Sequence, residues 1–196
     1  MSSLVTNPAP DFTAQAVMPA NCFEELTLSS FRGRYVLLFF YPLDFTFVCP
    51  SEILAFNRAN DEFKKRGCEL VGVSVDSQYT HFAWRNTPVN EGGIGQISFP
   101  LVADLDKSIA RKYGVLFNNE VALRGQFIID KEGVVRHALI NDLPLGRNVE
   151  EALRILDALQ FHEAHGEVCP ANWRPGEDAM TPTAEGVARY LASHNS

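Results

Sequence analysis

The chain has 196 residues, of which 46% are hydrophobic and 21% are charged, and its formal net charge is −7. This length suits one domain with a short appendage, and the ordinary composition excludes a disordered, collagenous or coiled-coil chain. The acidic balance argues against a nucleic-acid partner, because phosphate binding needs a concentrated basic surface. Residues 1–6 lack the charged and apolar regions of a secretory leader, and the apolar run 35–41 is far shorter than the roughly 20 residues of a membrane span. We therefore expect a cytoplasmic protein with no membrane partner.

Five short apolar runs predict buried strands, and helical patterns separate most of them. The expected strands are 35–41, 70–75, 99–103, 126–129 and 134–140. The expected helices are 51–66, 79–86, 106–113, 148–165 and 185–192. The turn Lys131-Glu132-Gly133 joins the last two strands into a hairpin.

This alternation of strands and helices implies a parallel core with right-handed crossovers, and the hairpin adds an antiparallel edge. The order predicts an α/β, thioredoxin-like fold, in which helices flank a central mixed sheet. After Gly166, prolines and glycines interrupt the pattern repeatedly. We therefore predict a thioredoxin-like domain over 1–165 and a C-terminal arm over 166–196.

The four cysteines, Cys22, Cys49, Cys68 and Cys169, are widely spaced and form no C-x-x-C motif. A disulfide framework belongs to small secreted chains, and an isolated cysteine in a reducing compartment is usually a small buried hydrophobic residue. We interpret Cys22 and Cys68 in this way.

Cys49 differs from the other cysteines in its position. It follows the first expected strand and lies just before the helix 51–66, with Pro50 suited to the first helical turn. Free backbone N–H groups and the helix dipole favour a negative charge at this place. The thiolate is the reactive form of cysteine, so Cys49 is the candidate nucleophile.

Ionisation alone does not make a fast catalyst, because charge that develops on a leaving group must also be stabilised. Thr46, three positions before Cys49, offers a hydroxyl. Arg124 begins the strand 126–129, which in a sheet of this order can lie beside 35–41 and bring a guanidinium close to the sulfur. An apolar collar that limits water is expected from Pro42, Phe45, Phe47 and Val48.

The run Pro42-x-x-x-Thr46-x-x-Cys49 resembles the active-site signature of the peroxiredoxins. Residues 44–52, Asp-Phe-Thr-Phe-Val-Cys-Pro-Ser-Glu, are similar to the typical two-cysteine subgroup, which includes the peroxidase component of bacterial alkyl hydroperoxide reductase. Ser51 stands where the family usually has threonine. The likeness extends over nearly the whole chain, through residues 76–84, 92–95, 124, 142–148 and 166–170.

The resemblance implies a thiol peroxidase that reduces hydrogen peroxide and small organic hydroperoxides, with a role in antioxidant defence. Cys49 would be the peroxidatic cysteine, which becomes a sulfenic acid. The other implied roles are a peroxide pocket of Pro42, Thr46 and Arg124 and a supporting pair of Glu52 and Arg147. We expect Trp84 to lie in the core or in the pocket wall.

The resemblance also implies that Cys169 is the resolving cysteine, which forms a disulfide with Cys49 of a partner subunit. A thioredoxin-type protein or a flavin disulfide reductase would reduce this bond, and no bound cofactor is implied. The family forms homodimers through the edge strand, here 134–140, and often a ring of five dimers with Thr80 and His81 near the second interface.

A disulfide requires Cα atoms within about 7 Å of each other. A cysteine held at a helix start under an apolar collar cannot meet that condition. We therefore expect the first turn after Cys49 and the arm around Cys169 to unwind in each catalytic cycle.

Three other interpretations are weaker or additional. His162 and His165, with Cys169 beyond, suggest a metal site, but histidines are also favourable at a helix C-terminus, and we expect no metal. A thioredoxin-like disulfide exchanger would need a cysteine where Glu52 stands. A ring-forming holdase chaperone is compatible with the resemblance as a second activity.

Overall fold

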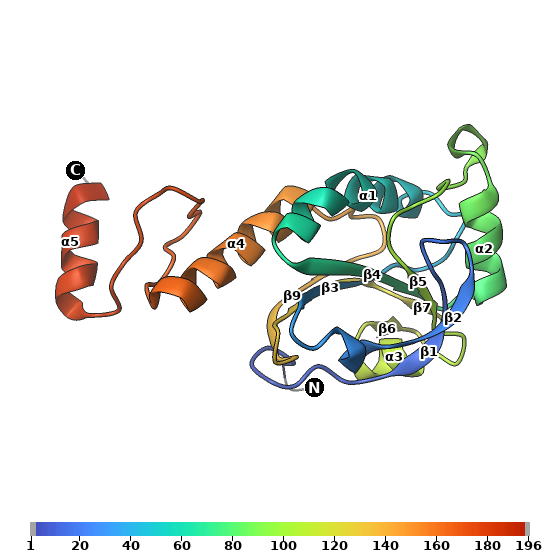
Figure 1. The fold of residues 1–196 in the computed structure, drawn as a ribbon, viewed down its shortest axis with the longest axis horizontal. Helices are drawn as coiled ribbons and strands as arrows, with labels where there is room; N and C mark the ends of the chain where they lie inside the picture. Colours follow the sequence, from blue (N-terminus) through green and yellow to red (C-terminus); the bar gives the residue numbers. More distant parts are fainter. Residues whose placement is uncertain (1–2, 195–196) are drawn as a thin grey trace. The chain divides into compact units, whose positions relative to one another are not determined.

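The computed structural model describes residues 3–194, and the chain divides into two compact units, Met1–Arg147 and Asn148–Ser196 (Figure 1). The first unit holds a seven-stranded sheet, a two-stranded sheet and three α-helices. Its strands are β1 (Thr13–Val17), β2 (Phe23–Thr27), β3 (Tyr35–Phe40), β4 (Cys68–Ser74), β5 (Leu101–Ala103), β6 (Leu116–Phe117), β7 (Val121–Ala122), β8 (Arg124–Ile129) and β9 (Val135–Asn141). Its helices are α1 (Cys49–Lys65), α2 (Gln78–Asn86) and α3 (Ser108–Lys112), with short 3₁₀ turns at Leu28–Phe31 and Val89–Glu91.

The large sheet has the order β2-β1-β5-β4-β3-β8-β9. Strands β3, β4 and β5 are parallel neighbours, whereas β8 pairs antiparallel with β3 and β9 antiparallel with β8. This arrangement confirms the predicted mixed sheet with a parallel core and a hairpin at its edge. It also places β8 beside β3, which the predicted order allowed.

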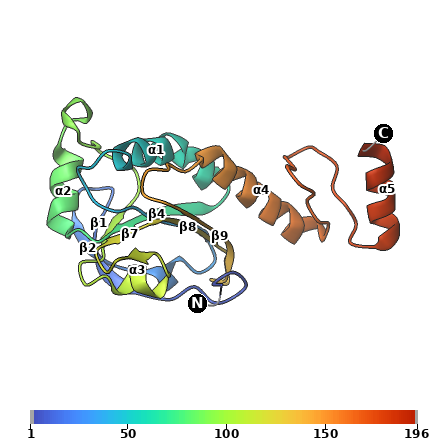
Figure 2. The same cartoon turned by 180° about the vertical axis from the view of Figure 1, so that it is seen from behind.

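The central strand β3 has no exposed residue, because helices cover both faces of the sheet (Figures 1 and 2). On one face, Phe39 stacks on Phe56 of α1 at a centroid distance of 4.6 Å. On the other face, Phe40 packs against Tyr113, which follows α3, at 5.2 Å. Alternate β3 side chains thus enter opposite cores, as the period of a strand requires.

Helix α1 ends as its sequence predicts. Lys64 and Lys65 lie in the last turn, where cations interact favourably with the helix dipole. Gly67 then adopts a left-handed backbone with φ of 64°, a conformation that glycine reaches without steric cost. The chain therefore turns directly from α1 into β4.

Sequence patterns did not predict the hairpin of β1 and β2 or the two-residue strands β6 and β7. The β2 sequence Phe-Glu-Glu-Leu-Thr carries two adjacent glutamates and is largely exposed, because it forms the outer edge of the sheet. Such a strand lacks the clear apolar alternation that marks a half-buried one.

The second unit contains α4 (Val149–His165) and α5 (Ala184–His194). Between them, Val168 and Met180 form an isolated antiparallel bridge, and Trp173 is buried. This division begins the second unit at Asn148 and so assigns α4 to it. The sequence predicted a domain boundary after residue 165, which stays a prediction. Within residues 3–194, no helix is long and apolar enough to cross a membrane.

Candidate active site

Cys49 is the first residue of α1, and its side chain is fully buried. The loop 41–48 connects the end of β3 to this helix, and Pro50 occupies the first turn as predicted. Val48 precedes the helix without a side-chain cap, so the N–H groups of the first turn have no capping oxygen from it. The sulfur therefore lies where the helix favours an anion.

Thr46 supplies the first polar contact of the sulfur. Its Oγ1 lies 3.0 Å from Cys49 Sγ and 2.8 Å from the carbonyl oxygen of Leu43. The single hydroxyl hydrogen can point to only one of these acceptors. When Cys49 is a thiolate, the hydroxyl can donate to the sulfur; when it is a thiol, the S–H can donate to the hydroxyl.

Arg124 supplies the second contact from the first position of β8. Its Nη1 lies 3.4 Å from Cys49 Sγ and 2.6 Å from Oε2 of Glu52. Its Nε donates to the carbonyl oxygen of Leu143 at 2.7 Å. The pairing of β8 with β3 thus brings a buried guanidinium to the sulfur, at the place that the sequence predicted.

Glu52 joins Arg124 to Arg147. Oε1 of Glu52 accepts from the backbone N and from Nε of Arg147, both at 2.8 Å, and Oε2 accepts from Nη2 at 3.0 Å. Nη1 of Arg147 donates to the carbonyl oxygens of Phe40 and Gly125. The predicted pair of Glu52 and Arg147 therefore holds Arg124 against β3 and β8.

The three side chains Arg124, Glu52 and Arg147 carry a net charge of one positive. Arg124 and Arg147 carry two positive charges, and Glu52 carries one negative charge. Burial lowers the pKa of Arg147, and the nearby Arg124 acts in the same direction, while Glu52 opposes both. A thiolate at Cys49 would neutralise the remaining positive charge.

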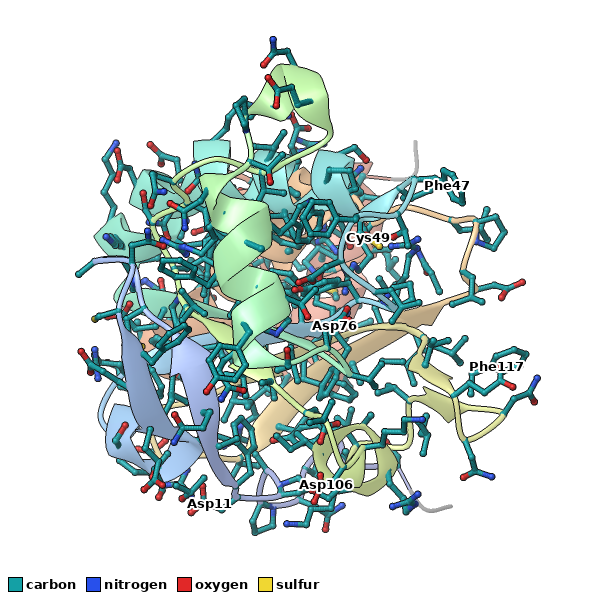
Figure 3. The ribbon with its side chains drawn as sticks, turned by 90° about the vertical axis from the view of Figure 1, so that its right-hand side faces the viewer. Asp11, Phe47, Cys49, Asp76, Asp106 and Phe117 are labelled. Atoms are coloured by element: carbon teal, nitrogen blue, oxygen red, sulfur yellow. The ribbon has the colours of Figure 1, made fainter. Side chains whose placement is uncertain are left out.

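The apolar collar differs in part from the prediction. Pro42 is buried and Val48 is half-buried, but Phe47 is 96% exposed and its ring lies at the outer edge of the unit (Figure 3). Phe45 adopts a left-handed backbone with φ of 52° and packs on Trp84 at a centroid distance of 5.8 Å. Because the loop turns at Phe45, Phe47 points to solvent and does not wall the sulfur in this structure.

Trp84 is buried behind this loop rather than open to a cavity. Its Nε1 donates to the carbonyl oxygen of Gly92 at 2.9 Å, and its ring lies 6.0 Å from the ring of Tyr41. Trp84 therefore packs on Phe45 from the interior of the unit.

The other three cysteines differ chemically from Cys49. Burial in β4 raises the pKa of Cys68 to about 12, so this thiol stays protonated at neutral pH. The pKa of Cys22 is raised by its hydrogen bond to Glu24. Cys169 is half-buried in the second unit, where its Sγ lies 3.6 Å from the carbonyl oxygen of Ala158, and burial raises its pKa despite the nearby Arg154.

A buried polar cluster near Cys49 escaped the sequence analysis. It contains the buried Tyr41 and Asp44 of the loop, the half-buried Asp76 after β4, and the buried His81 of α2. Nδ1 of His81 lies 2.7 Å from Oδ2 of Asp44, and the Tyr41 hydroxyl donates to Oδ1 at 2.8 Å. Asp44 stands inside the motif and His81 inside the matching stretch 76–84, but only the tertiary structure shows that they meet.

The histidines of α4 have local partners. Nδ1 of His162 lies 2.7 Å from the carbonyl oxygen of Glu167, and the His165 ring packs on Phe161 at 4.5 Å. Within residues 3–194, no three His, Cys, Asp or Glu side chains are grouped so that they could bind a metal ion.

Comparison with known proteins gives two family matches. Residues 5–138 match the AhpC/TSA family, and residues 158–193 match the C-terminal domain of 1-Cys peroxiredoxin. The second match contains Cys169.

Individual relatives agree over nearly the full length. Peroxiredoxin-2 of Rattus norvegicus is 55% identical over 97% of this chain and 96% of its own, and alkyl hydroperoxide reductase C of Helicobacter pylori strain J99 is 57% identical over 98% of both. The reduced crystal structure of Plasmodium vivax 2-Cys peroxiredoxin covers 97% of this chain and 100% of its own, with a TM-score of 0.96 and 54% identity. The chain therefore belongs to the AhpC/TSA family and is a peroxiredoxin, a thiol peroxidase with an antioxidant role.

Proposed function

We propose that Cys49 is the peroxidatic cysteine of this enzyme. The observation that carries the proposal is the position of its sulfur at the start of α1, 3.0 Å from the Thr46 hydroxyl and 3.4 Å from the Arg124 guanidinium. The thiolate attacks one peroxide oxygen, an S–O bond forms, and the O–O bond breaks. Thr46 and Arg124 orient the peroxide and stabilise the charge on the departing oxygen, which takes a proton and leaves as water or an alcohol.

The remaining site residues act around this step. Pro42 closes the buried side of the peroxide pocket, and Val48 and Phe45 restrict water at the loop. Glu52 and Arg147 keep Arg124 in place through their buried ion pairs. The substrates proposed are hydrogen peroxide and small organic hydroperoxides, because Cys49 is fully buried and a limited opening of the loop would admit only a small molecule.

Cys169 of a partner subunit then resolves the sulfenic acid. Its sulfur attacks the oxidised Cys49 sulfur, an S–S bond forms, and water leaves. A dithiol reductant of the thioredoxin type, or a flavin disulfide reductase, returns two electrons and restores both thiols. Two assays with peroxide and NAD(P)H identify which one serves: one contains a thioredoxin together with its NADPH-dependent reductase, the other the flavin disulfide reductase alone, and NAD(P)H consumption is followed in both.

A non-reducing gel after one equivalent of peroxide tests both cysteine assignments. Wild type should run as a covalent dimer, whereas Cys49→Ser and Cys169→Ser should each run as a monomer. Cys22→Ser and Cys68→Ser are the matched controls and should still give the dimer. A covalent dimer from Cys49→Ser would contradict the proposal.

We also propose a homodimer that assembles into a ring of five dimers. Strand β9 ends the sheet order and Ile140 on it is 48% exposed, which fits pairing through this edge. Around Thr80, the exposed ring of Phe23 packs against Tyr79 at 5.4 Å and against Phe82 at 5.3 Å, and the three rings form an apolar patch. Phe82→Glu should leave dimers and abolish larger rings in sedimentation velocity.

The same apolar patch is compatible with a secondary holdase activity. Large exposed apolar areas commonly mark surfaces that bind other chains. Cys49→Ser should still suppress the aggregation of a heated client protein and should not consume peroxide. Loss of both activities in this variant would contradict a separate chaperone function.

A further inference from the structure

The buried cluster beside the active site contains a pair of groups that must share a proton. Nε2 of His81 lies 3.1 Å from the carbonyl oxygen of Val102, which can only accept, so Nε2 carries a hydrogen. Nδ1 lies 2.7 Å from Oδ2 of Asp44. Two lone pairs repel at this distance, so a proton lies between them. The pair is either an imidazolium with a carboxylate or an imidazole with a carboxylic acid.

Two further groups, Tyr41 and Asp76, also contact Asp44. The Tyr41 hydroxyl donates to Oδ1 of Asp44, and burial raises the pKa of Tyr41 well above its usual range, so it stays a donor. From the end of β4, Oδ2 of Asp76 accepts the backbone N–H of Asp44 at 2.7 Å. Burial, with Asp44 nearby, raises the pKa of Asp76.

These contacts hold the loop at one residue. The backbone N–H of Asp44 binds Asp76, one carboxyl oxygen binds Tyr41, and the other binds His81. Beyond Asp44 the loop is less restrained, since Phe45 is 50% exposed and Phe47 is 96% exposed. Thr46, only two positions after Asp44, must keep its hydroxyl on the Cys49 sulfur.

We propose that Asp44 and His81 are positioning residues of this peroxidase: their shared proton attaches the loop 41–48 to α2 and β5. This attachment holds Thr46 against Cys49 and limits unwinding of the loop to the residues after Asp44. This inference rests on the proposed role of Cys49. Neither residue touches the reacting sulfur; both act through the loop that carries Thr46.

Two substitutions of His81 distinguish the effect of the hydrogen bond to Asp44 from the effect of the size of the imidazole ring. An asparagine places its amide near Nδ1, so His81→Asn can still donate to Asp44 but loses the Val102 contact. A glutamine places its amide near Nε2, so His81→Gln keeps the Val102 contact and loses the donor to Asp44. Both variants remove the imidazole from a fully buried position.

The readout is the alkylation rate of each cysteine in the reduced full-length protein with N-ethylmaleimide, resolved by peptide mass spectrometry. Because the Cys49 sulfur is fully buried, its reaction requires the loop to open. Cys68, buried in β4, reports global opening. In His81→Gln we expect Cys49 to react at least about tenfold faster with the maleimide, with Cys68 unchanged. The second-order rate of Cys49 with peroxide should fall about tenfold. Leaving a buried hydrogen-bonding group without its partner has this magnitude. In His81→Asn, Cys49 alkylation should stay within about threefold of wild type.

Asp44→Ala should reproduce the His81→Gln result, and the double variant should add little to either single change, because the two residues act as one unit. Equal acceleration in His81→Asn and His81→Gln would assign the effect to lost packing and overturn the proposal, as would an unchanged Cys49 rate in His81→Gln. If alkylation of Cys68 also accelerates in His81→Gln, the same two cysteine rates measured in Asp44→Ala decide the question. Acceleration of both Cys49 and Cys68 in Asp44→Ala would also overturn the proposal. Alkylation does not depend on peroxidase turnover. The alkylation rates therefore test the role of Asp44 and His81, whereas the non-reducing gel tests the assignment of Cys49.

Discussion

The guanidinium of Arg124 lies 3.4 Å from the sulfur of Cys49, although strand β8 carries one residue and helix α1 the other. The same Nη1 donates to Glu52 at 2.6 Å, and Nε donates to the carbonyl oxygen of Leu143. The guanidinium is therefore held at two of its nitrogens before any peroxide arrives. Such preorganisation allows it to stabilise charge on the departing oxygen without a reorganisation cost.

Two replacements of Arg124 should distinguish the contribution of its charge from that of its hydrogen-bonding geometry. We expect Arg124→Ala to lower kcat/KM for hydrogen peroxide by about 10²- to 10³-fold, the usual cost of removing one such donor. Arg124→Lys keeps a charge but cannot contact the sulfur, Glu52 and Leu143 together, so it should recover only part of the loss. Stopped-flow measurement of Cys49 oxidation provides the rate. A rate in Arg124→Ala within twofold of wild type would remove Arg124 from the mechanism.

Thr46 should matter through its hydroxyl rather than its shape. Thr46→Val keeps the branched side chain and removes the group that lies 3.0 Å from the sulfur. We expect the peroxide rate to fall by about 10- to 100-fold, because a hydrogen bond to a charged group contributes about 1.5–3 kcal/mol. Thr46→Ser is the matched control and should stay within about fivefold of wild type. Equal losses in both variants would indicate a packing role instead.

Glu52 should contribute to stability as well as to the site. Glu52→Gln leaves Arg124 and Arg147 buried without a carboxylate, and breaking a buried ion pair costs about 3–5 kcal/mol. Urea unfolding followed by circular dichroism measures the free energy of unfolding. As a control, Glu69→Gln removes a surface pair with Arg34 and should change it by less than about 1 kcal/mol.

Cys68 should make the protein less stable at alkaline pH. Its pKa rises from an ordinary thiol value of 9.0 to about 12 in the folded chain, so between these values the folded state binds more protons than the unfolded state. Its contribution is fully present below pH 9 and is lost as pH rises toward 12. Relative to Cys68→Ala, wild type should lose up to about 1.4 kcal/mol more per pH unit above pH 9. Parallel stability curves for the two proteins would contradict the burial of this thiol.

The sequence by itself determined the order of the main elements and the identity of the candidate nucleophile. Local patterns of residues predict buried strands such as 35–41 and the amphipathic helix after Cys49, which ends at a glycine. The predicted strand order even brought Arg124 to the correct edge, because parallel crossovers allow few arrangements.

Only the tertiary structure decided which side chains meet. The exposed ring of Phe47, the left-handed backbone of Phe45 and the pairing of Asp44 with His81 all depend on how the loop folds against α2. Edge strands such as β2 carry little apolar periodicity, so their pairing was equally invisible in the sequence. Burial is a property of the assembled core, and a buried proton or an exposed ring follows from packing between elements that lie far apart along the chain.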